Sequence, residues 1–206
     1  MNETQFQSTY SQPTYTTNSS IYPTRTIEVA AQGKISTTYD VLDTSNSTVL
    51  YTIKSSYLLK PHLTFISPSD NQEVATVSFH NLSTKIDITI RGRTSTIKPK
   101  WRLKESYEYT SPTSGTQRTW KSEKLISSSM VCLDEKELAL ARWQVPKWSW
   151  TKLGRLEIVG DAVGGGETFE ELIVTGMAVL IFRMRIAGVT AASGAGAASS
   201  AAAASV

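Results

Sequence analysis

The stretch EELIVTGMAVLIFRMR, from Glu170 to Arg185, decides which folds are open to this chain. Two acids precede a run of eleven uncharged residues, Leu172 to Phe182, and two arginines follow the run. A helix that is apolar on every face is enclosed either by protein or by lipid. Because a helix needs about 20 apolar residues to cross a bilayer, the short run predicts burial in a protein core.

The sequence does not decide whether this stretch forms a helix, a strand or a segment that enters lipid. Thr168 and Glu171 have the spacing of a capping box, in which each side chain bonds the backbone amide of the other. The early acids and late arginines also suit a helix dipole. However, the β-branched residues of the run favour a central strand, and a segment that enters lipid is a third possibility.

The chain before this stretch has the pattern of strands. Short alternating or apolar runs recur between turn residues, at 48–53, 63–66, 74–80, 86–90, 97–103, 119–121, 130–133, 138–143 and 156–159. Many short strands at such spacing indicate an antiparallel sandwich or barrel. Strands and helices do not alternate as a Rossmann-like sheet requires, so the predicted fold class is mainly β.

Both ends of the 206-residue chain differ in composition from its middle. Residues 1–24 hold one charge, Glu3, and are predicted to form a disordered polar tail. Residues 188–206 are Ala, Ser and Gly with scattered Val and Thr, and are predicted to form a second disordered tail. Residues 25–187 then make up one domain. Since the first tail lacks the features of a signal peptide, we expect a cytoplasmic protein.

The composition disfavours most catalytic chemistry. One cysteine, Cys132, and two histidines, His62 and His80, leave few ligands for a thiolate-rich site or a zinc centre. No G-x-S-x-G motif supplies a hydrolase nucleophile. We therefore expect a non-enzymatic protein with no catalytic residues, no metal and no cofactor.

Basic residues are concentrated in one part of the chain. The net charge is +3, from 21 Lys and Arg against 18 Asp and Glu, yet residues 85–104 hold seven basic residues and one acid. Four of the seven alternate and would share the outward face of a strand. Such a row repels itself unless an anion is near. The candidate anion- or lipid-binding residues are Arg91, Arg93, Lys98, Lys100, Arg102 and Lys104. The alternative is a solvated face that protects a sheet edge from aggregation.

A tryptophan cluster, WQVPKWSWTK, runs from Trp143 to Lys152. Trp148 and Trp150 share one strand face and are candidates for membrane contact, because indoles favour the headgroup region of a bilayer. Packing in the core or in a hairpin is the alternative explanation.

Several segments, taken in order, carry a family resemblance. They are YDVLDTSNSTVLYTI (39–53), ATVSFH (75–80), TWK (119–121), LARW (140–143), GRLEI (154–158) and the stretch EELIVTGMAVLIFRMR. The chain resembles uncharacterised fungal members of the tubby C-terminal-like superfamily, relatives of the LURP-one-related proteins and of phospholipid scramblases. The resemblance implies a closed antiparallel β-barrel of about twelve strands around a hydrophobic C-terminal helix. Arg183 and Arg185 would emerge at the barrel mouth, and Gly176 would lie mid-helix, at a cost of about 1 kcal/mol unless close packing requires it.

The resemblance also implies a function, since tubby proteins bind phosphoinositides. We expect peripheral binding of phosphoinositides or other anionic phospholipids through the basic face, by a monomer. Two alternatives remain, which are a module that recruits protein partners through the N-terminal tail and a scramblase-like membrane-associated protein. Nucleic acid is a less favoured partner.

Overall fold

The computed structural model describes residues 24–33, 37–80, 83–101, 105–123, 129–145 and 152–202. They form twelve strands, a short 3-10 helix and a long α-helix. The strands are β1 (Thr24–Ala31), β2 (Thr38–Asp43), β3 (Thr48–Ser55), β4 (Leu63–Ile66), β5 (Glu73–Phe79), β6 (Ile86–Ile90), β7 (Arg93–Trp101), β8 (Glu105–Thr110), β9 (Gln117–Ser122), β10 (Met130–Leu133), β11 (Ala139–Gln144) and β12 (Lys152–Val159). The helices are η1 (Gly160–Gly164) and α1 (Glu167–Ala202).

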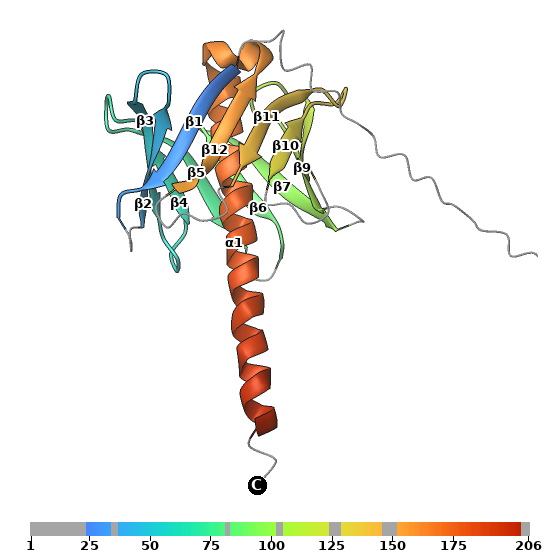
Figure 1. Ribbon diagram of the computed structural model, residues 1–206. Helices are drawn as coiled ribbons and strands as arrows, with labels where there is room; N and C mark the ends of the chain where they lie inside the picture. The colour runs from blue at the N-terminus through green and yellow to red at the C-terminus, as the bar shows by residue number, and fades with distance from the viewer. Residues whose placement is uncertain are drawn as a thin grey trace, which may run out of the picture.

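The strands close into a single antiparallel barrel (Figure 1). Each strand pairs with its neighbours in sequence, and β1 completes the ring by pairing with β12, with Thr24 opposite Val159. The predicted fold class, a mainly β closed antiparallel barrel around a hydrophobic C-terminal helix, is confirmed.

The observed strands include every run that the alternation pattern indicated. In β6, for example, Ile86, Ile88 and Ile90 are buried while the residues between them are partly exposed. The alternating runs did not include β1, β2 or β8. The sequence of β8, ESYEYT, is polar apart from its two tyrosines. Tyr107 and Tyr109 are nonetheless the buried residues of that strand, because aromatic rings with a polar tip can fill the interior of a barrel.

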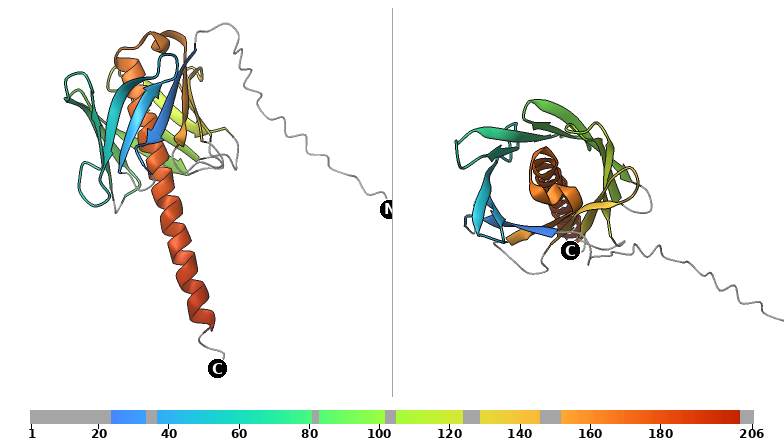
Figure 2. Two further views of the ribbon diagram at one scale, coloured as in Figure 1. Left: turned by 60° about the vertical axis from the view of Figure 1, so that its left-hand side comes forward. Right: turned by 90° about the horizontal axis from the view of Figure 1, so that it is seen from above.

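The helix α1 fills the interior of the barrel (Figure 2). All residues from Phe169 to Phe182 are buried, and the apolar ones belong to one core with the inward side chains of the strands. The apolar run Leu172 to Phe182 is therefore a helix enclosed by protein, rather than a strand or a segment in lipid. In the described part of the chain, no helix combines the length and the hydropathy needed to cross a bilayer.

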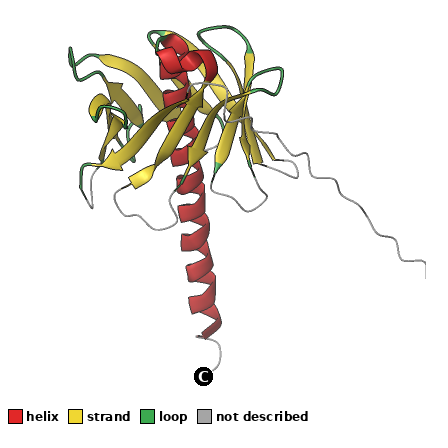
Figure 3. Cartoon of the chain, turned by 45° about the horizontal axis from the view of Figure 1, so that its top comes forward, coloured by secondary structure: helices red, strands yellow, loops and turns green. Residues whose placement is uncertain are grey.

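The two ends of the barrel are distinguished by α1, which begins at the upper end in Figure 1 and leaves through the lower end. At the lower end the Arg183 guanidinium pairs with Glu105 of β8 at 2.9 Å, and Arg185 donates to the Tyr57 carbonyl oxygen at 3.0 Å. Both arginines thus lie at a barrel mouth. Beyond the barrel α1 continues to Ala202 (Figure 3), past residue 188, where we predicted that a tail begins. The predicted N-terminal tail lies, apart from Thr24, outside the described residues.

The predicted capping box between Thr168 and Glu171 is wrong. The helix begins at Glu167, so Thr168 lies inside the first turn rather than before it. Glu171 instead faces the barrel wall, where its Oε1 accepts a hydrogen bond from Arg118 at 2.7 Å. A buried opposite charge on the wall binds this carboxylate more strongly than a backbone amide would.

Candidate functional site

Two of the predicted site residues are bound to acids at the start of α1. Arg91 makes two hydrogen bonds to the Glu170 carboxylate, at 3.1 and 2.9 Å, and Tyr51 donates a third at 3.1 Å. Arg93 pairs with Glu167 at 2.7 Å. These contacts neutralise both arginines and fasten the helix to the upper end of the barrel.

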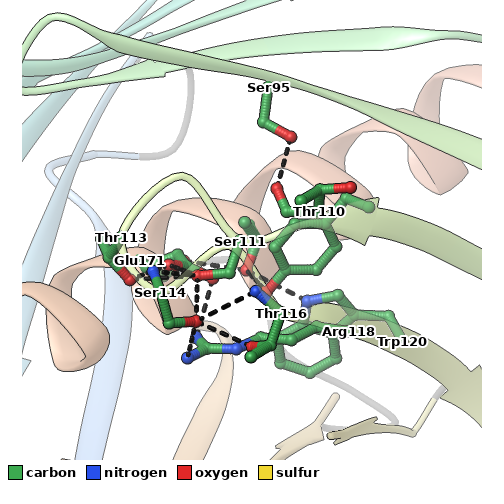
Figure 4. Close-up of polar contacts among 11 residues, drawn as sticks. Ser95, Thr110, Ser111, Thr113, Ser114, Thr116, Arg118, Trp120 and Glu171 are labelled. Carbon is green, nitrogen blue, oxygen red and sulfur yellow. Dashed lines mark hydrogen bonds and ion pairs between the residues drawn. The ribbon is translucent and has the colours of Figure 1, made fainter. Parts of the chain in front are cut away.

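A third arginine at the upper end also pairs with an acid of α1, among several hydroxyl side chains (Figure 4). Arg118 of β9 is 6% exposed and pairs at 2.7 Å with Glu171, which is 0% exposed. The other carboxylate oxygen of Glu171 accepts hydrogen bonds from Ser111 at 2.7 Å and from Thr113 at 2.5 Å. Both carboxylate oxygens of Glu171 therefore have partners, and the side chain is buried from water. We infer that this cluster stabilises the fold and does not bind a ligand.

The predicted basic face on β7 is only partly assembled. Lys98 and Lys100 lie exposed on the outer surface, on either side of Pro99. Lys100 pairs at 2.5 Å with Glu108 of β8, whereas no carboxylate among the described residues pairs with Lys98. Arg102 and Lys104 lie outside the described residues.

The lysines of the basic face also lie far from Arg91 and Arg93, the two arginines near the start of β7. Arg93 begins β7 at the upper end and Lys100 lies near its lower end, roughly 23 Å away along the strand. One headgroup cannot contact both. The strand itself is not a sheet edge, because its first half pairs with β6 and its second half with β8. Pro99 lies beyond the last pair with β6, where a proline breaks no bond to that strand.

An open pocket of about 480 Å³ lies on the outer wall where β7 extends past β6. Its lining includes Lys85, Lys98, His80, Asp87 and four hydroxyl side chains. Within the described part of the chain, neither lysine has a carboxylate partner. Ammonium groups and hydroxyls both donate hydrogen bonds to phosphate oxygens. The pocket therefore has the chemistry of a phosphate-binding site.

Some groups in this pocket are already engaged. The Ser95 hydroxyl donates to the Thr110 carbonyl oxygen at 2.6 Å, and the Thr96 hydroxyl donates to Asp87 at 2.8 Å. His80 contacts the other oxygen of Asp87 at 2.5 Å. Although partial burial alone would raise the pKa of Asp87, the hydrogen bonds from His80 and Thr96 hold it below its ordinary value. Asp87 is thus ionised but occupied, which leaves the two lysines to meet an anion.

The side of the lower end next to this pocket is electropositive. His62 is 3% exposed, and its Nδ1 accepts a hydrogen bond from the Phe79 amide at 3.0 Å. Burial lowers the pKa of His62, and the charges of Arg185, Lys60 and His80 lower it further. Arg185 comes from the end of the enclosed part of α1 and Lys60 from the connection between β3 and β4, so the fold brings two cations close to His62.

Lowering the pH from about 7 to about 5 is expected to reduce the free energy of unfolding through His62. Its folded-state pKa lies below that of the unfolded chain, so the unfolded state binds the proton more readily below about pH 6.5. The contribution of neutral His62 is complete above that pH and is lost as the pH falls. Urea unfolding at both pH values measures this loss, and His62→Gln should lessen it. An unchanged loss in the variant would contradict the assignment.

Several other side chains bear on chemistry. Trp148 and Trp150 lie outside the described residues, while Trp143 is buried in the core. Cys132 is 0% exposed, and burial raises the pKa of its thiol to about 12, which keeps it from acting as a nucleophile. No group of three or more His, Cys, Asp or Glu side chains is placed to hold a metal ion in the ranges that the structure describes.

One exposed feature at the lower end was not predicted from the sequence. The connection between β3 and β4 presents Tyr57, Leu58 and Leu59 to solvent. Three consecutive large apolar residues resemble part of a buried strand, and only their position in a loop, just before Pro61, hints at exposure.

Comparisons with protein-family models, with curated proteins and with solved structures found no match for this chain. The resemblance to the tubby C-terminal-like superfamily therefore stays a prediction from the segments that carry it.

Proposed function

We propose that this barrel is a non-enzymatic module that binds anionic phospholipid headgroups at a membrane surface. The observation that carries the proposal is the outer-wall pocket, where Lys85 and Lys98 have no carboxylate partner among the described residues. Three other cations that the sequence singled out, Arg91, Arg93 and Lys100, are instead paired with acids. Two cations left unmatched beside one pocket favour an external anion.

The details of the pocket favour a phosphate ester over a carboxylate. Besides the lysines, the Ser83 hydroxyl lines the pocket, as does that of Thr110, which accepts from Gln117 at 2.9 Å and keeps its own hydrogen to donate. Several donors around an open cavity suit the several oxygens of a phosphate group. An open pocket also admits a headgroup that remains attached to a bilayer.

The charge distribution suits a peripheral position at the cytoplasmic face. Anionic lipids give that leaflet a negative surface potential, and each lysine near it contributes about 1 kcal/mol of attraction. Lys60 lies just before β4 and Lys85 just before β6, both at the lower end of the barrel and two strands apart. The pocket and the loop that carries Lys60 therefore lie in neighbouring parts of the barrel.

Reversing the charge of Lys98 is expected to weaken vesicle binding about thirtyfold, since Lys98→Glu changes the local charge by two units, worth about 2 kcal/mol. Flotation with vesicles of phosphatidylcholine alone, with added phosphatidylserine, or with added phosphatidylinositol phosphate measures the effect. If the protein binds the phosphatidylinositol phosphate vesicles more strongly than phosphatidylserine vesicles of the same charge, a phosphate ester is the ligand.

The matched control is Lys136→Glu. Lys136 is exposed in the turn between β10 and β11, at the upper end of the barrel, so this variant has the same net charge as Lys98→Glu. We expect it to float like the natural protein. If both variants float equally, with or without losses, the pocket is not the lipid site.

A further inference from the structure

The connection between β3 and β4 exposes three consecutive large apolar side chains. Tyr57 is 72% exposed, Leu58 85% and Leu59 74%. The surrounding strands bury their apolar residues on the inward face, as Ile53 and Leu63 do at 0% exposure. The segment Tyr57–Leu59, here called the apolar tip, thus departs from the pattern of the barrel.

The base of the apolar tip is held by specific contacts. The Leu59 amide donates to the Ser56 hydroxyl at 3.0 Å, and the Ser56 amide donates to the His62 carbonyl oxygen at 2.8 Å. Arg185 of α1 donates to the Tyr57 carbonyl oxygen at 3.0 Å, and its guanidinium lies 4.9 Å from the centre of the Tyr57 ring. The two leucines are therefore presented outward from a fixed base.

Cations flank the apolar tip. Lys54 and Lys60 flank it in sequence, both are exposed, and neither pairs with an acid among the residues described. The connection that carries Lys60 lies at the lower end of the barrel beside β4, and Lys85 lies at the same end two strands away, just before β6. The tip and the outer-wall pocket therefore occupy neighbouring parts of the barrel. Apolar side chains flanked by lysines match the boundary between the acyl chains and the anionic headgroups of a bilayer.

We propose that the apolar tip inserts into the acyl–headgroup boundary of an anionic membrane while the outer-wall pocket holds a headgroup. This inference rests on the proposed function and adds the element that anchors the barrel. Because α1 continues out of the lower end (Figure 3), that end cannot approach a membrane squarely. The barrel docks on its side instead, with the tip, the pocket and the length of α1 along the surface.

A second copy of this chain fits the apolar tip less well. A symmetric contact would bring the lysines of the two copies together around the tip, and like charges oppose such an interface. An anionic bilayer attracts the same lysines. It also accommodates a protruding side chain without a complementary groove.

Cysteine labelling tests the insertion directly. Leu58→Cys is labelled with an environment-sensitive dye on the full chain, and the native Cys132 stays unlabelled because it is buried. Vesicles contain equal parts of phosphatidylcholine and phosphatidylserine, with or without brominated acyl chains. We expect the dye emission to rise and shift to the blue on binding, and to be quenched by the brominated chains. Leu138→Cys is the control, because Leu138 is 61% exposed at the upper end.

A binding measurement complements the labelling. The exposed pair Leu58→Ser and Leu59→Ser should fold normally and bind these vesicles at least about tenfold more weakly. Two results together would overturn the insertion and leave the proposed function intact. They are vesicle binding by the labelled protein without quenching of the dye, and undiminished binding by the serine variant. No binding by the natural protein would overturn both. A dye response that depends on protein concentration without vesicles would show a second copy as the occupant and overturn the insertion.

Discussion

Replacing Arg118 with alanine is expected to destabilise the barrel by about 3–5 kcal/mol, because the change leaves a buried carboxylate without its charge partner. Glu171 is 0% exposed and lies on the enclosed part of α1. Without Arg118, only the Ser111 and Thr113 hydroxyls remain to stabilise its charge. Urea unfolding at neutral pH measures the loss, which would be a large fraction of the stability of a domain of this size.

The matched control is Arg93→Ala. Arg93 also joins the barrel wall to an acid of α1, but its side chain is 51% exposed and that of Glu167 is 50% exposed. An exposed pair contributes about 1 kcal/mol or less. Similar losses in the two variants would show that burial does not set the strength of these contacts.

A double replacement separates the charge from the packing at the same position. Arg118→Met with Glu171→Leu removes both charges and keeps most of the volume, so most of the stability should return. If the double variant is as unstable as Arg118→Ala, the hydroxyl cluster around Glu171 contributes more than the ion pair.

The strand pattern was predictable from short-range periodicity. The burial of the apolar run was predictable from its length and lack of charge, which left open whether the run forms a helix or a strand. Alternation in β6 marks its inward isoleucines, and the apolar run from Leu172 to Phe182 can be satisfied only by an enclosure. The number and closure of the strands came instead from the family resemblance. Local pattern misses a strand such as β8, whose buried residues are tyrosines.

The pairing of charges was not predictable, because it depends on which segments meet in space. The acids at the start of α1 looked like helix caps, yet Glu170 and Glu171 bind Arg91 and Arg118 from distant parts of the chain. The same limit applies to the basic face. Alternation correctly placed Lys98 and Lys100 outward, but Glu108 reaches Lys100 only because β8 pairs with β7.

Two glycines accommodate one indole in the core. A Cβ added to Gly154 of β12 would lie 2.6 Å from Nε1 of Trp143 and 2.8 Å from the Gln144 carbonyl oxygen. A Cβ added to Gly176 of α1 would lie 3.4 Å from Trp143 and 3.1 Å from Trp120. Trp143 is 1% exposed and Trp120 0%. The mid-helix glycine thus lets α1 approach two tryptophans, which accounts for a residue that otherwise weakens a helix.

Gly154→Ala is expected to destabilise the barrel by about 2–3 kcal/mol, although alanine ordinarily improves on glycine in a strand. The added methyl group meets two obstacles, Nε1 of Trp143 at 2.6 Å and the carbonyl oxygen of Gln144 at 2.8 Å. Because Gln144 lies in the strand that pairs with β12, relief of the second contact requires distortion of the ladder. Gly176→Ala meets only ring atoms at 3.1 Å or more and gains about 1 kcal/mol of helix propensity, so its net effect should stay within about 1 kcal/mol.

Urea unfolding of the two variants compares the same added methyl group at two sites. A loss at Gly176 equal to or larger than the loss at Gly154 would contradict the expectation that the closer contacts at Gly154 are the harder to relieve. Repeating Gly154→Ala in a Trp143→Leu background isolates the indole contribution, since any recovery there measures the coupling between the two side chains.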